Sequence, residues 1–222
     1  MRRQWLFLWV TTLGCAHGPT PCVGATACPA GQECLADRCV VAGGLPVPPG
    51  SERRVLRPVA MAVLSRSRSG AELPSSVTFG SRAEGETLLL LRFAPSWAAD
   101  APVESAFLLL HPRDGTGAAL DDVRLDVWRI EEPWTAERTT WLERPSLGHP
   151  HSRGRARSAP PTTLRIDVTR FVRATSGSGR PNHGLAVVAS AAFPHGATFA
   201  TGAGGGRPPE LEVYLKTTSR EP

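Results

Sequence analysis

The stretch VWRIEEPWTAERTTW, residues 127–141, carries three of the six tryptophans of this 222-residue chain. Large aromatic side chains bury much apolar surface, so such a cluster usually marks where a protein core closes. The stretch starts in a predicted strand, residues 123–130, which Pro133 ends because proline cannot donate a ladder hydrogen bond. Residues 139–141 then return to residue types that favour extended chain. We predict core packing for Trp128, Trp134 and Trp141, although the same rings could stack on sugars.

Further short strands are predicted on both sides of this stretch. The runs TLLLLRF (87–93) and VESAFLLL (103–110) are apolar on both sides of the pleat, which indicates central strands buried on both faces. In residues 210–216, we predict that Leu211, Val213 and Leu215 face the core and that Glu212, Tyr214 and Lys216 face outward. The remaining predicted strands are residues 55–64, at an edge because of Pro58, and residues 77–79, 164–169, 184–192 and 197–200.

One short helical turn, Arg170–Ala174 capped by Thr169, is the helical feature that the sequence predicts. Residues 146–161, rich in Pro, Arg and His, are predicted as a loop. The chain has 22 glycines and 21 prolines, which suits short strands joined by many turns. We therefore expect an all-β fold, an antiparallel β-sandwich of the jelly-roll kind, over residues 55–217.

The N-terminus has the features of an export signal. Met1-Arg2-Arg3 is positively charged, and the apolar run that follows is shorter than the ~20 residues that span a bilayer. Residues 1–14 are therefore predicted as a signal peptide. The segment ends in TTLGC, which resembles the cleavage box of bacterial lipoproteins, so Cys15 is the predicted lipidation site. The alternative is that Cys15 is an unpaired thiol beside an ordinary signal peptide.

Residues 15–40 form a cysteine-rich segment that contains all five cysteines of the chain. Without Cys15, four closely spaced cysteines remain, which predicts a disulfide framework in an exported protein. The segment is poor in apolar residues, so crosslinks have to define its fold. Three pairings are possible among Cys22, Cys28, Cys34 and Cys39. A zinc site is the alternative, although the segment has no CxxC pair and exported thiols tend to oxidise.

A linker, residues 41–54, follows this segment. Its dense prolines, Pro46 and Pro48-Pro49, favour an extended and semi-rigid chain, which we expect to hold the sandwich away from the cysteine-rich segment and the membrane. The whole chain has a net charge of +5 and a pI of about 9.4. Its arginines are scattered rather than massed on one periodic face, so nucleic-acid binding is not indicated.

Two sets of residues are candidates for binding a polysaccharide. Trp97 lies in the loop-like run APSWAADAP, where an exposed indole ring offers a platform for a sugar. Arg153, Arg155 and Arg157 alternate with small residues and could meet anionic polysaccharide or lipid headgroups. The alternative for the three arginines is a solvated loop without a ligand.

The sequence does not predict an enzyme. The predicted sandwich contains no G-x-S-x-G nucleophile elbow and no cysteine. His149 and His151 have no third ligand nearby, so no metal site is predicted. No cofactor is expected, apart from a structural calcium ion to which Asp121-Asp122 could contribute. Paired carboxylates could hydrolyse a glycosidic bond, but adjacent charges at a strand end are usually solvated; the residues concerned are Glu131, Glu132, Glu137 and Glu143.

Six segments of the chain follow a distinctive order and spacing. They are LLLLRF, VESAFLLL, VWRIEEPWTAERTTW with RPSLG, LRIDVTRFV, NHGLAVVAS and ATFATGAGGGRPPELEVYL. This order resembles the DNRLRE-domain family, which comprises β-sandwich modules of secreted and cell-surface bacterial and archaeal proteins. The resemblance covers residues 88–215. It implies a jelly-roll architecture and a carbohydrate-binding module, since the family includes such modules, some of them acting on acidic polysaccharide.

Resemblance and export signal together imply a non-catalytic binding or adhesion module of the cell envelope. The expected partners are a polysaccharide or a cell-surface protein, with no nucleic acid and with the membrane reached only through the N-terminal lipid. Ala16 stands where some lipoproteins carry an aspartate that retains them in the inner membrane, so we expect an outer-membrane lipoprotein. A secreted protein is the alternative. A purely structural or protein-interaction module is the second functional hypothesis, and a polysaccharide-degrading enzyme is the third.

Overall fold

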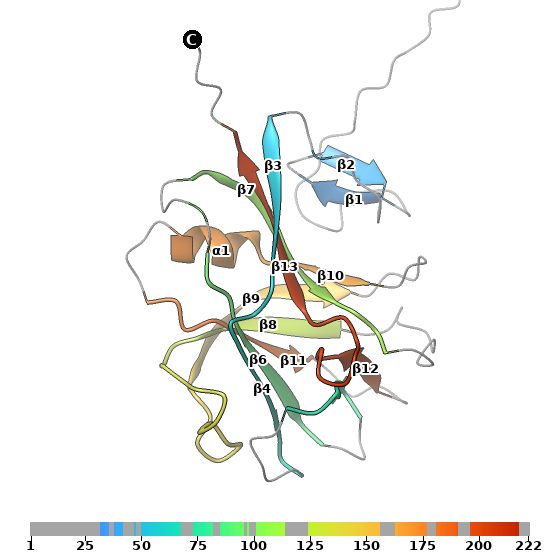
Figure 1. The fold of residues 1–222 in the computed structure, drawn as a ribbon, viewed down its shortest axis with the longest axis vertical. Coiled ribbons are helices and arrows are strands. Elements are labelled where there is room, and N and C mark those ends of the chain that lie inside the picture. Colours follow the sequence, from blue (N-terminus) through green and yellow to red (C-terminus); the bar gives the residue numbers. More distant parts are fainter. Residues whose placement is uncertain are drawn as a thin grey trace, which may run out of the picture.

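The computed structural model describes residues 32–35, 38–41, 47, 50–67, 73–81, 85–95, 97, 101–113, 124–155, 163–176, 181–190 and 196–217 (Figure 1). Two antiparallel sheets form its main layers. The four-stranded sheet has the order β10 (Leu164–Asp167), β7 (Val103–Leu110), β13 (Glu210–Lys216) and β3 (Ser51–Leu56). The five-stranded sheet has the order β4 (Ala60–Ser65), β6 (Thr87–Arg92), β11 (Leu185–Ala189), β8 (Arg124–Ile130) and β9 (Leu147–Arg155).

Three smaller elements complete the described fold. Strands β12 (Ala197–Ala200) and β5 (Ser76–Phe79) form a two-stranded sheet, and β1 (Gln32–Leu35) and β2 (Arg38–Val41) form a hairpin. Helix α1 (Thr169–Ser176) follows β10 and lies against β7.

The strand order is that of a jelly roll, as the sequence predicted. Eight strands (β3, β6, β7, β8, β9, β10, β11 and β13) divide four and four between the two sheets, and β4 adds an edge beside β6. The first of them, β3, pairs antiparallel with the last, β13, and the second, β6, pairs with β11, which is the last but one. This pairing of strands from opposite ends of the chain wraps the sandwich and closes it.

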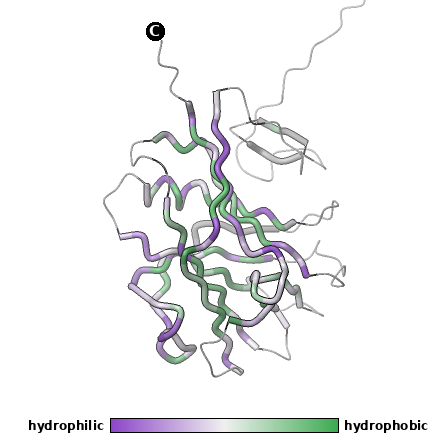
Figure 2. The backbone as a smooth tube through the Cα atoms, viewed as in Figure 1, coloured by the Kyte–Doolittle hydropathy of each residue, from purple (hydrophilic) through white to green (hydrophobic). Residues whose placement is uncertain are grey.

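The main core lies between the two sheets. Its fully buried side chains include Leu89 and Leu91 of β6, Leu108 of β7, Val127 of β8 and Val213 of β13. Figure 2 shows hydrophobic residues running along the strands that cross the middle of the molecule. In β13 the predicted alternation is confirmed, because Leu211, Val213 and Leu215 belong to this core while Glu212 and Tyr214 lie on the other face.

A second core covers the outer face of the five-stranded sheet. Leu88 and Leu90 of β6 belong to it, so β6 is buried on both faces as predicted. Residues 131–146, which leave β8, fold over this face and place Trp134 against the sheet with 4% of its surface exposed. The Trp134 indole N–H donates to the carbonyl of His183 at 2.7 Å, and the Arg92 guanidinium lies 5.6 Å from its ring. The tryptophan-rich stretch is therefore the cover of the second core.

One predicted loop is a strand. Residues 147–155 of the predicted loop 146–161 form β9, the edge strand that pairs with β8. Pro150 is tolerated because an edge strand leaves one side of its backbone unpaired, and the register shifts around its partner Trp128. Polar and proline-rich composition therefore hid a strand that needs only one neighbour.

Three boundaries also differ from the sequence prediction. Residues 55–64 are not one strand, because the chain breaks at Arg57–Val59 and passes from β3 in one sheet to β4 in the other. Residues 139–141, expected to be extended, lie in a turn region outside any strand. The helix spans Thr169–Ser176, and Thr169 does not cap it: its hydroxyl accepts the Ala106 N–H at 2.9 Å instead.

Candidate functional site

Trp97 lies at one end of the sandwich, in the loop that follows β6. It is partly buried, packs against the main core, and donates its indole N–H to the hydroxyl of Ser176 at 3.3 Å. The ring is therefore fixed in orientation by packing on one side and by a hydrogen bond to α1. An indole held in this way needs no ordering when a ligand meets its remaining surface.

A shallow hollow borders this indole. It is formed by the loop after β6, the second half of α1 and the turn before β11, and its polar edge is made by Thr175, Ser176 and Asn182. The hollow is wide open, and its volume of about 280 Å³ includes open solvent at its mouth. Its cavity volume is about 10 Å³, which is room for roughly one water molecule. A ligand would lie across this hollow and not inside it.

Local hydrogen bonds fix the polar edge of the hollow. Asn182 accepts the Gly184 N–H at 3.1 Å and donates its amide to the Phe93 carbonyl at 3.4 Å. The Thr175 hydroxyl donates to the Phe171 carbonyl one helical turn earlier. The Ser176 oxygen accepts from Trp97, and its own proton has no acceptor among the described residues. The edge can therefore exchange hydrogen bonds with hydroxyl groups.

Gly184 brings this turn close to β6. Its φ is +97°, and a Cβ there would stand 2.2 Å from the Leu91 carbonyl oxygen. Only glycine fits such a close approach in the left-handed region. The NHG part of the NHGLAVVAS segment therefore has a structural role at the end of the sandwich.

The predicted arginines do not share this end of the molecule. Strand pairing sets Leu91, near Trp97, beside Leu185 and Arg129, whereas Arg155 pairs with Arg124 at the other end of β8. Arg124 and Arg129 lie roughly 17 Å apart along β8 at about 3.3 Å per residue. Arg153 lies opposite Asp126 in the same pairing, and Arg157 lies outside the described residues. Trp97 and the arginines thus mark two separate places.

The carboxylates near the tryptophans lie at the surface. Glu131, Glu132, Glu137 and Glu143 are all exposed. Glu132 accepts the Ser146 N–H at 3.1 Å, a hydrogen bond that lowers the pKa of this carboxyl and favours its charged form. Trp128 and Trp141 are partly buried against the second core, and the Arg144 guanidinium lies 4.7 Å from the Trp141 ring. In this region the tryptophans pack against the second core, and the four carboxylates are exposed to solvent.

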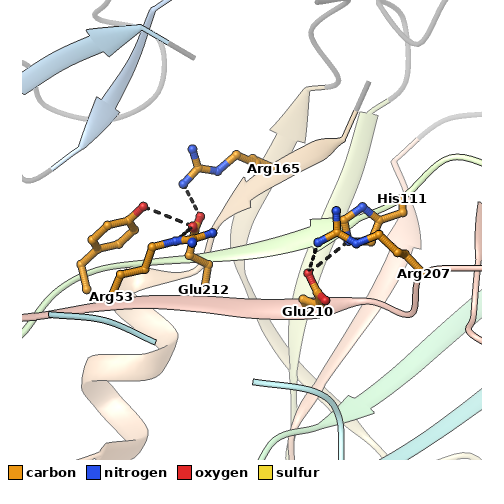
Figure 3. Close-up of polar contacts among 7 residues, drawn as sticks. Arg53, His111, Arg165, Arg207, Glu210 and Glu212 are labelled. Atoms are coloured by element: carbon orange, nitrogen blue, oxygen red, sulfur yellow. Dashed lines mark hydrogen bonds and ion pairs between the residues drawn. The ribbon is translucent and has the colours of Figure 1, made fainter. Parts of the chain in front are cut away.

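A polar cluster that the sequence did not predict lies on the outer face of the four-stranded sheet (Figure 3). Glu212 of β13, 4% exposed, accepts hydrogen bonds from Arg53 of β3 and Arg165 of β10. The Tyr214 hydroxyl donates to the same carboxylate at 3.2 Å, and burial beside this charge raises the pKa of Tyr214. The Arg165 guanidinium also lies 4.3 Å from the ring centroid of Phe107.

A second polar group lies further along the same face. His111, which follows β7, has its Nε2 3.4 Å from Glu210, and Glu210 accepts from Arg207 at 2.7 Å. Burial and the Arg207 charge lower the pKa of His111, with Glu210 opposing them. The alternation of β13 predicted which of its residues face outward. The alternation did not predict the partners of these residues, because the partners come from strands far away in the sequence.

Several predicted features lie outside the described residues. They are the signal peptide 1–14, Cys15, Cys22, Cys28 and the proposed calcium ligands Asp121-Asp122. Cys39 is buried and disulfide-bonded, and the pairing of β1 with β2 sets Cys34 opposite it. In the part of the chain that the structure describes, no three His, Cys, Asp or Glu residues gather as a metal site, and no helix is long and apolar enough to cross a membrane.

Comparison with known proteins adds no assignment. The chain matches no protein-family model, and a search of curated proteins finds no match.

Proposed function

We propose that this chain is a non-catalytic binding module of the cell envelope that recognises polysaccharide. The observation that carries the proposal is the fixed indole of Trp97 beside a shallow hollow edged by Thr175, Ser176 and Asn182. Sugar rings present apolar faces and hydroxyl edges, and an indole beside hydrogen-bonding groups offers a complement to both. A surface that a ligand lies across suits a polymer better than a small free solute.

Sequence features support the cellular part of the proposal. The export signal and the TTLGC sequence ending at Cys15 suit an exported, lipid-anchored protein, with the outer membrane as its expected location. The resemblance to the DNRLRE-domain family points to the same class of module. Because a fold alone does not imply a function, the proposal depends on the Trp97 surface and not on the sandwich.

The direct test is binding of the exported chain, with Cys15→Ser to prevent lipidation, to neutral and acidic polysaccharides at low and moderate salt. We expect retention that persists at moderate salt and is lost with Trp97→Ala. Trp97→Phe keeps an aromatic face but loses the bond to Ser176, so it should retain part of the binding. Leu142→Ala, at a side chain that is 92% exposed, is the matched surface control.

A variant that replaces Arg153, Arg155 and Arg157 by alanine separates the two candidate places. If retention disappears with these arginines or with added salt, and survives in Trp97→Ala, only charge attraction operates and the Trp97 proposal is wrong. If no polysaccharide is retained, a protein-interaction module becomes the better hypothesis.

A further inference from the structure

His111 and Arg207 face the same oxygen atom of Glu210 (Figure 3). The Arg207 Nη2 donates to Oε2 of Glu210 at 2.7 Å, and the Nε2 of His111 lies 3.4 Å from that same Oε2. The three residues come from different elements, since His111 follows β7, Glu210 begins β13 and Arg207 belongs to the turn between β12 and β13. One carboxylate oxygen is therefore within reach of two basic side chains.

The two basic side chains differ in their contact with water. The side chains of His111 and Glu210 are each 9% exposed, whereas the side chain of Arg207 is 67% exposed. An exposed arginine loses little when water replaces its carboxylate, because ion pairs at the surface contribute little to stability. A charged imidazole at a buried position has no such replacement. We therefore expect the carboxylate to pair with His111 whenever that ring is charged.

Near neutral pH the His111 ring does not compete for Glu210. Burial and the Arg207 charge lower the pKa of His111 below 6.5, so the ring is neutral there. Its Nδ1 lies 3.3 Å from the Thr163 hydroxyl, and its buried Nε2 has no hydrogen-bond partner among the described residues. A charged ring carries a proton on both nitrogens, so its Nε2 becomes a donor that faces Oε2 of Glu210.

Other charged side chains of the described elements around the ring have partners of their own. Arg165, on the neighbouring strand β10, pairs with Glu212, and Arg113, two residues after His111, donates to the Ser75 hydroxyl. Strand β12, with the sequence ATFA, carries no charged side chain. The exchange of one carboxylate between an arginine and a histidine is therefore the event that protonation of this ring controls.

Arg207 ends an exposed, glycine-rich turn. Residues 204–206 are three exposed glycines, and glycine restricts the backbone less than any other residue type. At the β12 end, the turn is held by Thr201, whose hydroxyl donates to the Pro74 carbonyl. At the β13 end, the ion pair between Arg207 and Glu210 ties it to the sheet. Loss of this ion pair would release the turn on the β13 side.

We propose that Glu210 is a proton-controlled latch on the glycine-rich turn, residues 202–207. Near neutral pH the carboxylate holds Arg207, and the turn is ordered. When acid charges the ring of His111, the carboxylate pairs with His111, Arg207 moves into water, and the turn is freed while the sandwich stays folded. This latch is independent of the polysaccharide site proposed at Trp97.

Nuclear magnetic resonance of the complete exported chain, carrying Cys15→Ser, measures both events in one acid titration. The ring signals of His111 report its protonation, and nitrogen relaxation of residues 204–206 reports the order of the turn. As His111 becomes charged, we expect the amide order parameters of these glycines to fall from about 0.85 to below about 0.6, with the same midpoint as the ring. An unchanged indole N–H signal of the buried Trp134 verifies that the sandwich remains folded.

Two variants separate the latch from a general effect of acid. His111→Gln cannot take up a proton, so the turn should stay ordered over the same pH range. Arg207→Gln lacks the tie to Glu210, so the turn should be mobile already at neutral pH. Order parameters that stay constant while the ring titrates, or that fall equally in His111→Gln, would overturn the proposal. An ordered turn in Arg207→Gln, or a His111 ring that stays neutral until the sandwich unfolds, would contradict it as well.

Discussion

Glu212 and Arg165 stand 47 residues apart in the chain and form an ion pair on the outer face of the four-stranded sheet. Arg165 belongs to β10, one edge of this sheet, and Arg53, which binds the same carboxylate, belongs to β3 at the other edge. One carboxylate on β13 therefore holds side chains from both edge strands. This relationship makes Glu212 the centre of the outer face.

Glu212→Gln tests this role. The substitution keeps the shape of the side chain but leaves two guanidinium groups facing a neutral amide at a buried position. We expect a loss of about 2 kcal/mol in the free energy of unfolding, measured by urea denaturation, since hydrogen bonds to charged groups are worth about 1.5–3 kcal/mol. Glu52→Gln removes the partner of Arg54 at the surface and should leave the urea midpoint almost unchanged. Equal effects of the two substitutions would contradict a central role for Glu212.

Comparing Gly184→Ala with Gly85→Ala separates the stability cost of a steric clash from the cost of a positive φ. A Cβ at Gly184 would stand 2.2 Å from the Leu91 carbonyl oxygen, and this backbone atom cannot move without disturbing β6. We expect a loss of more than about 2 kcal/mol in stability, from overpacking together with an unfavourable φ. Gly85→Ala is the matched control, because Gly85 has a φ of +72° but nothing within 4 Å of its Cβ position. Gly85→Ala should cost only about 1 kcal/mol.

Trp134→Phe tests the cover of the second core. Phenylalanine still fills part of the site but cannot donate to the His183 carbonyl, which then loses a 2.7 Å hydrogen bond. We expect thermal unfolding to begin earlier, with a loss of about 2 kcal/mol in stability. Leu142→Ala, further along the same covering segment, should stay within about 0.5 kcal/mol of the parent. A neutral Trp134→Phe would mean that residues 131–146 do not contribute to the stability of the sandwich.

His111 gives the sandwich a pH dependence of known sign. Burial and the Arg207 charge lower the pKa of His111 below its ordinary value of 6.5. The unfolded chain therefore takes up the proton more readily, so acid favours unfolding. The contribution of neutral His111 to folding stability is complete above a pH of about 6.5. It is lost as the pH falls from there towards the lower pKa of His111 in the folded state. Urea midpoints between about pH 8 and pH 5 should fall more steeply for the parent than for His111→Gln, whose other titrating groups are the same.

Apolar periodicity predicted the parts of the fold that depend on local burial. The continuous run in β6 indicated burial on both faces, and the alternation of β13 gave the correct face for Leu211 and Val213. Edge strand β9 escaped prediction because one paired side demands neither apolar residues nor an absence of proline. Local composition therefore predicts the position of a central strand, but it says little about where an edge strand lies.

The candidate sites also differ in how much of each depends on local sequence. Trp97 was singled out because it lies in a loop-like run outside any predicted strand, and the structure places a shallow hollow beside it. The Arg53–Glu212–Arg165 cluster was not identifiable, since its members lie on three strands whose adjacency follows from the jelly-roll order. A sequence pattern cannot reveal an ion pair that topology creates.

The hydrogen bond between the Gly50 carbonyl and the Thr217 amide means that the connectivity of this sandwich could be changed without changing its fold. The chain enters and leaves the two layers through a single point, so a few added residues would join residues 50 and 217 into a ring. New ends opened at the exposed Leu142 would then give a circular permutant that keeps every strand pairing of the two main sheets. For the same reason, the sandwich could be inserted as a unit into a surface loop of another protein, because its two ends at residues 50 and 217 lie side by side.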